Sequence, residues 1–338
     1  MAIIPIRNRR IALVGGVGFI GHHLALRLKA LGADVQVVDS LQVNNLGAIG
    51  SAPEYADNRE LYLRFAHERI NLLNAAQIPL HVIDARDYSA LTRTLEAIDA
   101  QVIVQLAAVA HANRSNKDPH STFDHSLRTL ENALDIARPM TEHFIYLSSS
   151  MVYGNFATDT VTEEAPCEPL GIYGALKFAG EKLVIGYNQA FNLTYTIIRP
   201  SALYGERCVS RRVGQIFIEN ALRGRELVLS GDGSERLDFT YIDDFVSGVV
   251  AVIQNTNSHN QIFNITHGEA RPTSDLIAIL RDHFPITVRT EPKDRLTPER
   301  GTLSIDKARR LLGYEPKFPI DLGYRRYIEW YKSLAPGA

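Results

Sequence analysis

The chain has 338 residues, of which 45% are apolar and 22% charged, which is ordinary for a globular protein with one large domain and a smaller one. Its formal net charge of −2 gives no overall field that would attract nucleic acid or anionic lipid, so we expect no nucleic acid and no membrane among its partners. Two cysteines, Cys167 and Cys208, are too few for a disulfide framework and are typical of a reducing compartment, which predicts a cytoplasmic protein.

The N-terminal part alternates short apolar runs with amphipathic stretches, starting with an apolar segment at 11–28. Four glycines, two histidines and Arg27 interrupt that segment, so it suits a strand, a turn and a helix better than a signal peptide. The runs that read as buried strands are Ile11–Val14, Val35–Val38, His81–Ile83, Val102–Leu106, Phe144–Leu147 and Thr194–Ile198. The stretches that read as helices are Ile20–Leu31, Arg59–Ala76, Tyr88–Ile98, Thr122–Ala137 and Ile172–Asn188, with a loop at Asn44–Asp57.

This alternation predicts an α/β fold with a Rossmann-like, doubly wound parallel sheet. The second half is less regular and predicts a smaller C-terminal α/β lobe that binds the substrate. We expect a strand at Asp238–Ile242 and helices at Val213–Arg223, Asp243–Ile253, Ser274–Phe284 and Ile320–Leu334. We place a dinucleotide-binding domain at 1–180, joined by the strand at 194–200 and part of 238–255, and the substrate lobe mainly at 181–338.

A glycine-rich turn follows the first predicted strand. Gly15 permits a tight turn, Gly18 lets the backbone approach a pyrophosphate, and Gly21 lets the helix pack closely on the strand. The start of the helix offers free N–H groups and a partial positive charge to phosphates. A glycine pattern alone also fits an ordinary structural turn.

Acidic residues at the ends of the next two strands favour a dinucleotide. Asp39 lies about 20 residues beyond the turn, where a ribose 2′-hydroxyl is read, and its charge would repel a 2′-phosphate. No Arg or Lys lies between Asp34 and Asn58, so we predict NAD rather than NADP. Asp84 suits the adenine amino group, and equally suits a helix N-cap.

Three side chains suggest proton transfer. Ser149 follows a strand at the edge where ligands bind in doubly wound folds. Tyr173 and Lys177, four residues apart, share one helix face. A free phenol has a pKa of about 10 and is a poor base, but a nearby ammonium and a positive nicotinamide ring favour the phenolate. Tyr173 would then take a proton from a sugar hydroxyl, Ser149 would bond the same oxygen, and Lys177 would also hold the nicotinamide ribose. An isolated pair of this spacing is commonly a surface pair; the serine turn and the glycine turn favour the catalytic interpretation.

In order and spacing, these segments resemble the extended short-chain dehydrogenases/reductases, specifically the NAD-dependent nucleotide-sugar epimerase/dehydratase family. The resemblance runs from about Ile11 to Tyr331. The segments that carry it are Gly15–Gly21, Asp39, Asp84, Leu106–Ala108, Arg114-Ser115, Ser149, Val152–Gly154, Tyr173–Lys177, Glu181, Arg199-Pro200, Tyr204-Gly205, Tyr241–Asp244 and Leu311–Pro316.

The resemblance implies a tightly bound NAD, a nucleotide sugar between the lobes and no metal. It implies Ser149, Tyr173 and Lys177 as the catalytic trio. Residues expected at the cofactor are Gly15, Gly18, Phe19, Ile20, Gly21, Asp39, Ser40, Asp84, Ala85, Leu106, Ala107, Ala108, Tyr173, Lys177 and Pro200. Residues expected at the substrate are His111, Ser115, Ser150, Arg236 and Arg300. It also implies a homodimer that forms through Thr122–Ala137 and Ile172–Asn188.

Departures from the family pattern narrow the chemistry. Dehydratases place an Asp-Glu pair just after the catalytic hydroxyl, and here Ser150 and Met151 stand there, so elimination lacks its carboxyl groups. We therefore expect a nucleotide-sugar 4-epimerase, with UDP-sugars favoured. A 4-ketosugar reductase, a dehydratase or decarboxylase of the same family, and a non-catalytic NAD-binding sensor remain alternatives. Leu237 replaces a diphosphate-binding arginine, for which Arg236, Arg295 or Arg300 are candidates.

Three further features allow two interpretations each. His111 contacts the sugar or is a hydrogen-bonded loop histidine. Arg207, Arg211 and Arg212 capture a diphosphate or form a solvated surface cluster. The pair Asp243-Asp244 resembles two catalytic acids, but we interpret it as the start of a helix.

Overall fold

A seven-stranded parallel sheet forms the centre of the computed structural model, which describes residues 3–43, 45–109, 112–293 and 297–334. The order of strands is β12-β7-β5-β4-β1-β2-β3. Their bounds are Arg10–Val14 (β1), Asp34–Asp39 (β2), Leu80–Val82 (β3), Val102–Gln105 (β4), His143–Leu147 (β5), Tyr195–Arg199 (β7) and Gln261–Asn264 (β12). The order reverses between β1 and β4, and such a switch point opens a crevice at the carboxyl ends of the strands.

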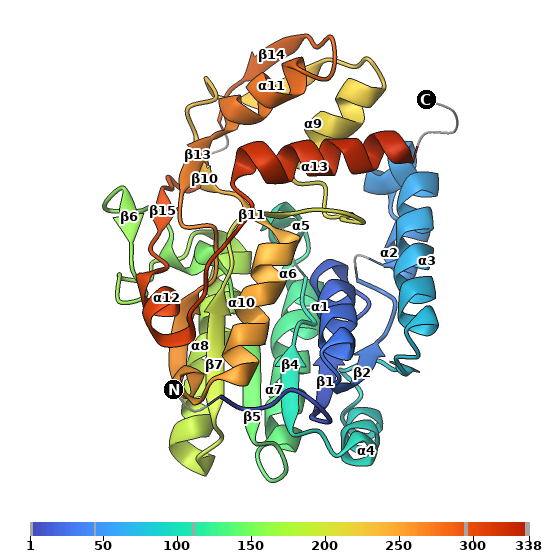
Figure 1. Ribbon diagram of the computed structural model, residues 1–338, viewed down its shortest axis with the longest axis vertical. Helices are drawn as coiled ribbons and strands as arrows, with labels where there is room; N and C mark the ends of the chain where they lie inside the picture. Colours follow the sequence, from blue (N-terminus) through green and yellow to red (C-terminus); the bar gives the residue numbers. More distant parts are fainter. Residues whose placement is uncertain (1–2, 44, 110–111, 294–296, 335–338) are drawn as a thin grey trace.

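Helices cover both faces of this sheet (Figure 1), as expected for strands that are apolar on both sides. The apolar core on one face includes residues of α1, α3 and α10, and the core on the other includes residues of α4, α7 and α8. The helices are α1 (Phe19–Ala30), α3 (Arg59–Ala75), α4 (Tyr88–Ile98), α7 (Thr129–Ala137), α8 (Gly171–Phe191) and α10 (Ile242–Gln254). Two cores separated by one sheet are the packing that the alternating pattern predicts.

The C-terminal part lies beyond the carboxyl ends of the strands, at the top of Figure 1. It contains α9 (Val213–Leu222), α11 (Thr273–Arg281), α13 (Ile320–Ser333) and the parallel pair β9 (Leu227–Ser230) and β14 (Val288–Glu291). Further short elements are α5 (Ala112–Lys117), α6 (Pro119–Phe123), α12 (Asp306–Leu312), β6 (Thr160–Val161), β8 (Leu203–Tyr204), β10 (Arg236–Asp238), β11 (Thr240–Tyr241), β13 (Ala270–Pro272) and β15 (Thr302–Leu303). The C-terminal part therefore covers the open side of the crevice.

The strands and long helices of the first half agree with the sequence interpretation, but three segments differ. The expected loop at Asn44–Asp57 contains a helix, α2 (Leu46–Ser51), and a 3₁₀ turn. The expected helix Thr122–Ala137 is interrupted by a π-helical turn at Asp124–Arg128. The expected strand Asp238–Ile242 is divided between β10 and β11, which pair with different partners.

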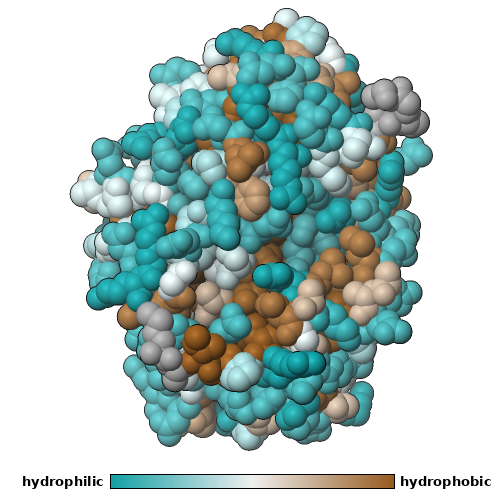
Figure 2. Space-filling model, viewed as in Figure 1, coloured by the Kyte–Doolittle hydropathy of each residue, from teal (hydrophilic) through white to brown (hydrophobic). Residues whose placement is uncertain are grey.

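One face of the surface mixes hydrophilic and hydrophobic residues, and the hydrophobic ones gather mostly in its lower half (Figure 2). That half corresponds to the sheet and its covering helices in Figure 1. In the described part of the chain, no helix combines the length and the apolar character needed to cross a membrane.

Candidate active site

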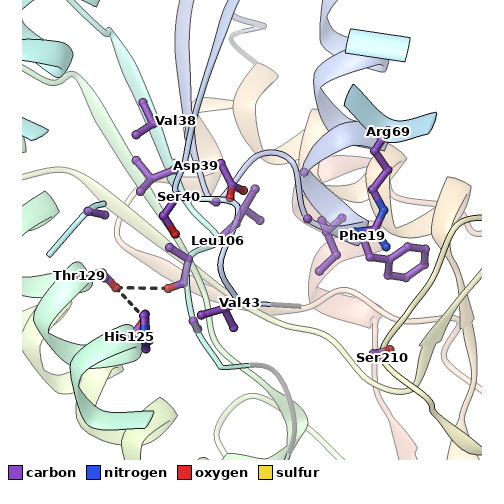
Figure 3. Close-up of a pocket in the computed structure, with 18 of the residues that line it drawn as sticks. Phe19, Val38, Asp39, Ser40, Val43, Arg69, Leu106, His125, Thr129 and Ser210 are labelled. Carbon is purple, nitrogen blue, oxygen red and sulfur yellow. Dashed lines mark hydrogen bonds between the residues drawn. The ribbon is translucent and has the colours of Figure 1, made fainter. Parts of the chain in front are cut away.

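A cavity at the switch point is lined by most of the predicted cofactor residues (Figure 3). It lies beside the ends of β1, β2 and β4. The predicted residues that line it are Gly15, Gly18, Phe19, Ile20, Gly21, Asp39, Ser40, Asp84, Ala85, Leu106, Ala107 and Ala108. Segments from four separate parts of the sequence therefore converge on one crevice.

The glycine turn has the tight geometry that its sequence predicts. Gly15 has a φ of +86°, and a Cβ there would lie 2.6 Å from the backbone nitrogen of Ala107. A Cβ at Gly21 would lie 2.5 Å from the Cα of Gly16, so a side chain would push α1 away from the turn. Gly18 is the N-cap of α1. The free N–H groups of the helix therefore begin at the cavity wall.

The side chain of Asp39 is hydrogen-bonded to the glycine turn. Its carboxylate accepts hydrogen bonds from the backbone nitrogens of Val17, at 2.9 Å, and Leu41, at 2.8 Å. Burial raises the pKa of Asp39, and these two bonds oppose the rise. The carboxylate is thus fixed in place and lines the cavity, as a ribose-binding group must be.

Asp84 lies in the cavity wall and is not a helix cap. The N-cap of α4 is Asp87, whose side chain accepts from the nitrogen of Ala90. Asp84 is paired with Arg86, with 2.6 Å between Oδ2 and Nη2, and this hydrogen bonding lowers the pKa of Asp84. The capping alternative for Asp84 is therefore excluded.

The structure adds cavity residues that the sequence did not single out. His125, from the π-helical turn, and Thr129, the first residue of α7, both line the cavity, and Thr129 Oγ1 donates to the carbonyl of His125 at 3.0 Å. Single π turns inside helices are often found at functional sites. Arg69, from α3, also lines the cavity and is fully buried. No local motif marks it, because only the packing of α3 on α1 brings it there.

A second cavity, of about 280 Å³, adjoins the first, and the two share Ile20, Leu106, Ala108, Leu203 and Arg212. All three predicted catalytic residues line it. Ser149 Oγ accepts a bond from the nitrogen of Met151 at 3.2 Å, which leaves its hydroxyl proton available for a ligand oxygen. Tyr173 is 9% exposed and Lys177 is 6% exposed, so both are buried side chains in the cavity wall.

Lys177 is held in place by its surroundings. Its ammonium donates to the carbonyl of Leu147 at 2.6 Å and lies 5.1 Å from the centre of the Tyr146 ring. Burial lowers the pKa of Lys177 to about 8, while the charge of Glu181 opposes the shift. The ammonium is therefore weakly solvated, and its charge acts strongly on nearby groups.

A buried ion pair lies beside the strand end that carries Ser148 and Ser149. Glu181 accepts two bonds from Arg199, at 2.9 and 2.7 Å, and a third from the hydroxyl of Ser148 at 2.5 Å. The side chains of the pair are only 2–3% exposed. Because Glu181 lies one turn beyond Lys177, the pair fixes α8 against the strand ends that carry Ser148 and Ser149.

Comparison with known proteins identifies the family. Residues 11–266 match the NAD dependent epimerase/dehydratase family. The chain belongs to this family. It is 29% identical to an uncharacterised UDP-glucose epimerase of Bacillus subtilis, over 97% of this chain and 99% of the relative.

Two solved structures of this epimerase/dehydratase family are similar over nearly the whole chain. One is UDP-glucuronic acid 4-epimerase from Bacillus cereus with UDP-glucuronic acid and NAD, with a TM-score of 0.84 and 25% identity, covering 96% of this chain and 99% of that one. The other is a dTDP-glucose 4,6-dehydratase from Streptomyces venezuelae with NAD bound, with a TM-score of 0.81 and 28% identity, covering 96% and 97%. These likenesses confirm the predicted Rossmann-like fold.

NAD is the cofactor of this epimerase/dehydratase family member, and the first cavity has the groups to hold it. The N–H groups at the N-terminus of α1 would hold a diphosphate, and the carboxylate of Asp39 would hold a ribose. The Nη1 atom of Arg69 is buried without a hydrogen-bond partner among the described residues. An anionic dinucleotide fits this set of donors.

The predicted substrate residues are brought together only in part. Ser150 and Arg300 line the second cavity, and so does Pro200, which was expected at the cofactor. Ser115 is fully buried in α5 and lines none of these cavities, whereas its neighbour Asn116 does. His111 and Arg295 lie outside the described residues.

Arg236 is not brought to the site. Its side chain is exposed, and its guanidinium donates to the carbonyl of Ala270 at 3.0 Å. The next residue, Leu237, lines a third cavity instead. Successive side chains of a strand point to opposite faces, so a shift of one residue turns Arg236 away from the cavity.

The third cavity extends the second one into the C-terminal part. The two share Ala202, Leu203, Arg212, Thr297 and Arg300. Aromatic side chains of Phe239, Tyr324 and Tyr327 form part of its wall. Arg212 lines all three cavities, although its two neighbours in the predicted cluster, Arg207 and Arg211, line none of them.

Proposed function

We propose that the chain is an NAD-dependent nucleotide-sugar 4-epimerase acting on a UDP-sugar. The observation that carries this proposal is the convergence of Ser149, Tyr173 and Lys177 in a cavity that adjoins the dinucleotide cavity. The likeness to UDP-glucose and UDP-glucuronate 4-epimerases over nearly full length supports it.

The reaction begins at the C4 hydroxyl of the sugar. The phenolate of Tyr173 takes the hydroxyl proton while the C4 hydrogen leaves as a hydride and a C4 carbonyl forms. When bound, NAD would supply the acceptor for this hydride and its donor in the return step. The ammonium of Lys177, one helical turn from Tyr173, stabilises the phenolate through its poorly solvated charge. The hydroxyl of Ser149 donates to the same sugar oxygen and keeps C4 oriented.

Epimerisation needs no further acid or base. Once the 4-keto sugar has turned over within the cavity, the hydride returns to its other face and Tyr173 gives back the proton. An elimination would need carboxyl groups beside C5 and C6. The side chains beside Ser149 are Ser150 and Met151, and no Asp or Glu lines this cavity among the described residues.

The shared wall between the second and third cavities suits the diphosphate of the substrate. Arg212 and Arg300 both lie there, and guanidinium groups bind phosphate oxygens in a bidentate manner. The third cavity then takes the nucleoside against its aromatic wall. We therefore assign the diphosphate of the substrate to Arg300 and Arg212 rather than to Arg236.

Proton NMR of purified protein with UDP-glucose, UDP-N-acetylglucosamine and UDP-glucuronate tests the proposal. We expect the C4 configuration of at least one sugar to scramble without added NADH. In Tyr173→Phe, turnover should fall by about 10²- to 10⁴-fold, the usual contribution of an acid–base group. Bound NAD should remain. Consumption of added NADH with a UDP-4-keto sugar, and no scrambling of the three alcohols, would instead indicate a 4-ketosugar reductase. Scrambling at full rate in Tyr173→Phe would refute the assigned base.

The same proposal includes a cytoplasmic homodimer. The segments Thr122–Ala137 and Ile172–Asn188 are its contact region. Phe123 is 46% exposed and Ile172 is 36% exposed at the starts of these segments, which leaves apolar surface for a partner. Light scattering should give twice the 37.7 kDa chain mass, and a monomer at micromolar concentration would refute the dimer.

A further inference from the structure

A buried arginine in the dinucleotide cavity has an unfilled hydrogen-bonding position. Arg69 lies in the middle of α3 and is 0% exposed. Its Nε and Nη2 atoms donate to the carbonyl of Arg207, while Nη1 has no partner among the described residues. Figure 3 shows the side chain extending from α3 toward Phe19, the first residue of α1. The free donor is therefore next to the glycine turn.

The charge of Arg69 is also poorly compensated. Within the described part of the chain, it has no ion pair with a carboxylate, and Asp39 acts on it only through a longer electrostatic interaction. Burial is the main reason that the pKa of Arg69 falls to about 10, and Arg207 adds to the fall. A buried cation without a paired anion is costly, so this position favours an anionic occupant.

The backbone that Arg69 holds belongs to the cavity wall. The segment 205–212, which we call the strap, contributes Val209, Ser210 and Arg212 to the lining. Its other anchor is the side chain of Arg207, which donates to His22 Nε2 at 3.1 Å and pairs with Glu68 at 3.1 Å. Arg69 thus holds the strap to α3, in the wall of the cavity that the glycine turn also lines.

We propose that Arg69 binds the diphosphate of NAD through Nη1 while its other nitrogens hold the strap over the cofactor. The backbone N–H groups at the start of α1 bind one side of the diphosphate, and Arg69 binds it from the α3 side. The glycine turn is thereby only half of the anion site, and the other half comes from a residue about 50 positions later in the sequence.

Binding to NAD-free protein tests this role with three probes. For Arg69→Met, we expect affinity for ADP-ribose to fall by about 10- to 100-fold, the loss of one charge-assisted hydrogen bond. Affinity for 2′-phospho-ADP-ribose should fall by the same factor, and weak adenosine binding, followed by NMR, should not change. The NAD that co-purifies should fall accordingly. Arg64→Met, an exposed arginine on the same helix, is the matched control and should bind all three probes as the parent does.

Two results would overturn the proposal. Unchanged ADP-ribose affinity in Arg69→Met would remove Arg69 from the diphosphate site. An equal loss of adenosine and ADP-ribose binding would show that Arg69 only shapes the cavity. If Arg69→Met does not fold, Arg69→Lys, which keeps the charge, is compared with Arg69→Gln. We expect Arg69→Lys to retain more ADP-ribose affinity than Arg69→Gln. The reverse order would contradict an anion-binding role.

Discussion

Replacement of Lys177 by Met should remove a gain in stability that the NAD-free protein makes as the pH rises above 8, and it should abolish turnover. In the folded chain the pKa of Lys177 is lowered to about 8 by burial, against about 10.5 in the unfolded chain. The unfolded chain therefore binds more protons between these values, and folding is weakened below pH 8 by about 3 kcal/mol, at 1.36 kcal/mol for each pKa unit. As the pH rises from 8 to 10.5, this penalty is relieved and the parent protein gains stability.

The variant lacks this titration. Its loss of the donor to the carbonyl of Leu147 costs about 1–3 kcal/mol at every pH, since that acceptor is left unpaired. The difference in unfolding free energy between Lys177→Met and the parent should therefore shift by about 2 kcal/mol in favour of the parent between pH 7 and 9.5.

Urea unfolding of NAD-free protein, followed by circular dichroism at several pH values, measures this shift. All other groups titrate in both proteins and cancel in the difference. Lys182→Met, an exposed lysine on the same helix, should show no pH-dependent difference from the parent. A difference between Lys177→Met and the parent that stays constant from pH 7 to 9.5 would refute the reasoning, because it would mean that Lys177 is not desolvated in the folded chain.

Three further outcomes are expected. Glu181→Gln should lower the unfolding free energy by about 3–5 kcal/mol in urea, because it leaves buried Arg199 without its carboxylate; a loss below 1 kcal/mol would contradict this. Ala202→Gly should raise the melting temperature by a few degrees, because Ala202 has a φ of +37° in the left-handed region, which costs a residue with a Cβ about 1–2 kcal/mol; a lower melting temperature would speak against strain there. Asp39→Ser should reduce the preference for NAD over NADP by at least about tenfold in binding assays, since the carboxylate no longer repels a 2′-phosphate; an unchanged preference would remove Asp39 from that role.

Features that depend on local pattern could be predicted from the sequence. The strands β1, β4 and β5 are buried over nearly all of their length, and such strands appear as short continuous apolar runs. The glycine turn and the spacing of Tyr173 and Lys177 are likewise set by neighbours in the chain. β12 was not predicted, because its sequence, Gln-Ile-Phe-Asn, is half polar, and only pairing with β7 makes it part of the sheet.

Features that depend on tertiary packing were missed or misplaced. Arg69 has no motif, and its role arises because α3 packs beside α1. Arg236 was placed at the substrate, but it alternates with Leu237 on β10 and faces away from the third cavity. Ser115 was expected at the substrate from the family resemblance, but it is buried in α5, and its neighbour Asn116 lines the cavity.

The residues that line the cavities share an energetic property. Lys177 carries a desolvated charge, Arg69 has a buried donor without a partner, and Ala202 has a left-handed backbone. Each of these features weakens the empty protein, and the first two are relieved when anionic ligands or hydroxyl groups fill the site. Ligand binding removes these free-energy penalties, which folding alone leaves in place. The free energy recovered adds to the affinity of the site for its ligands. We therefore expect bound NAD to raise the stability of the protein.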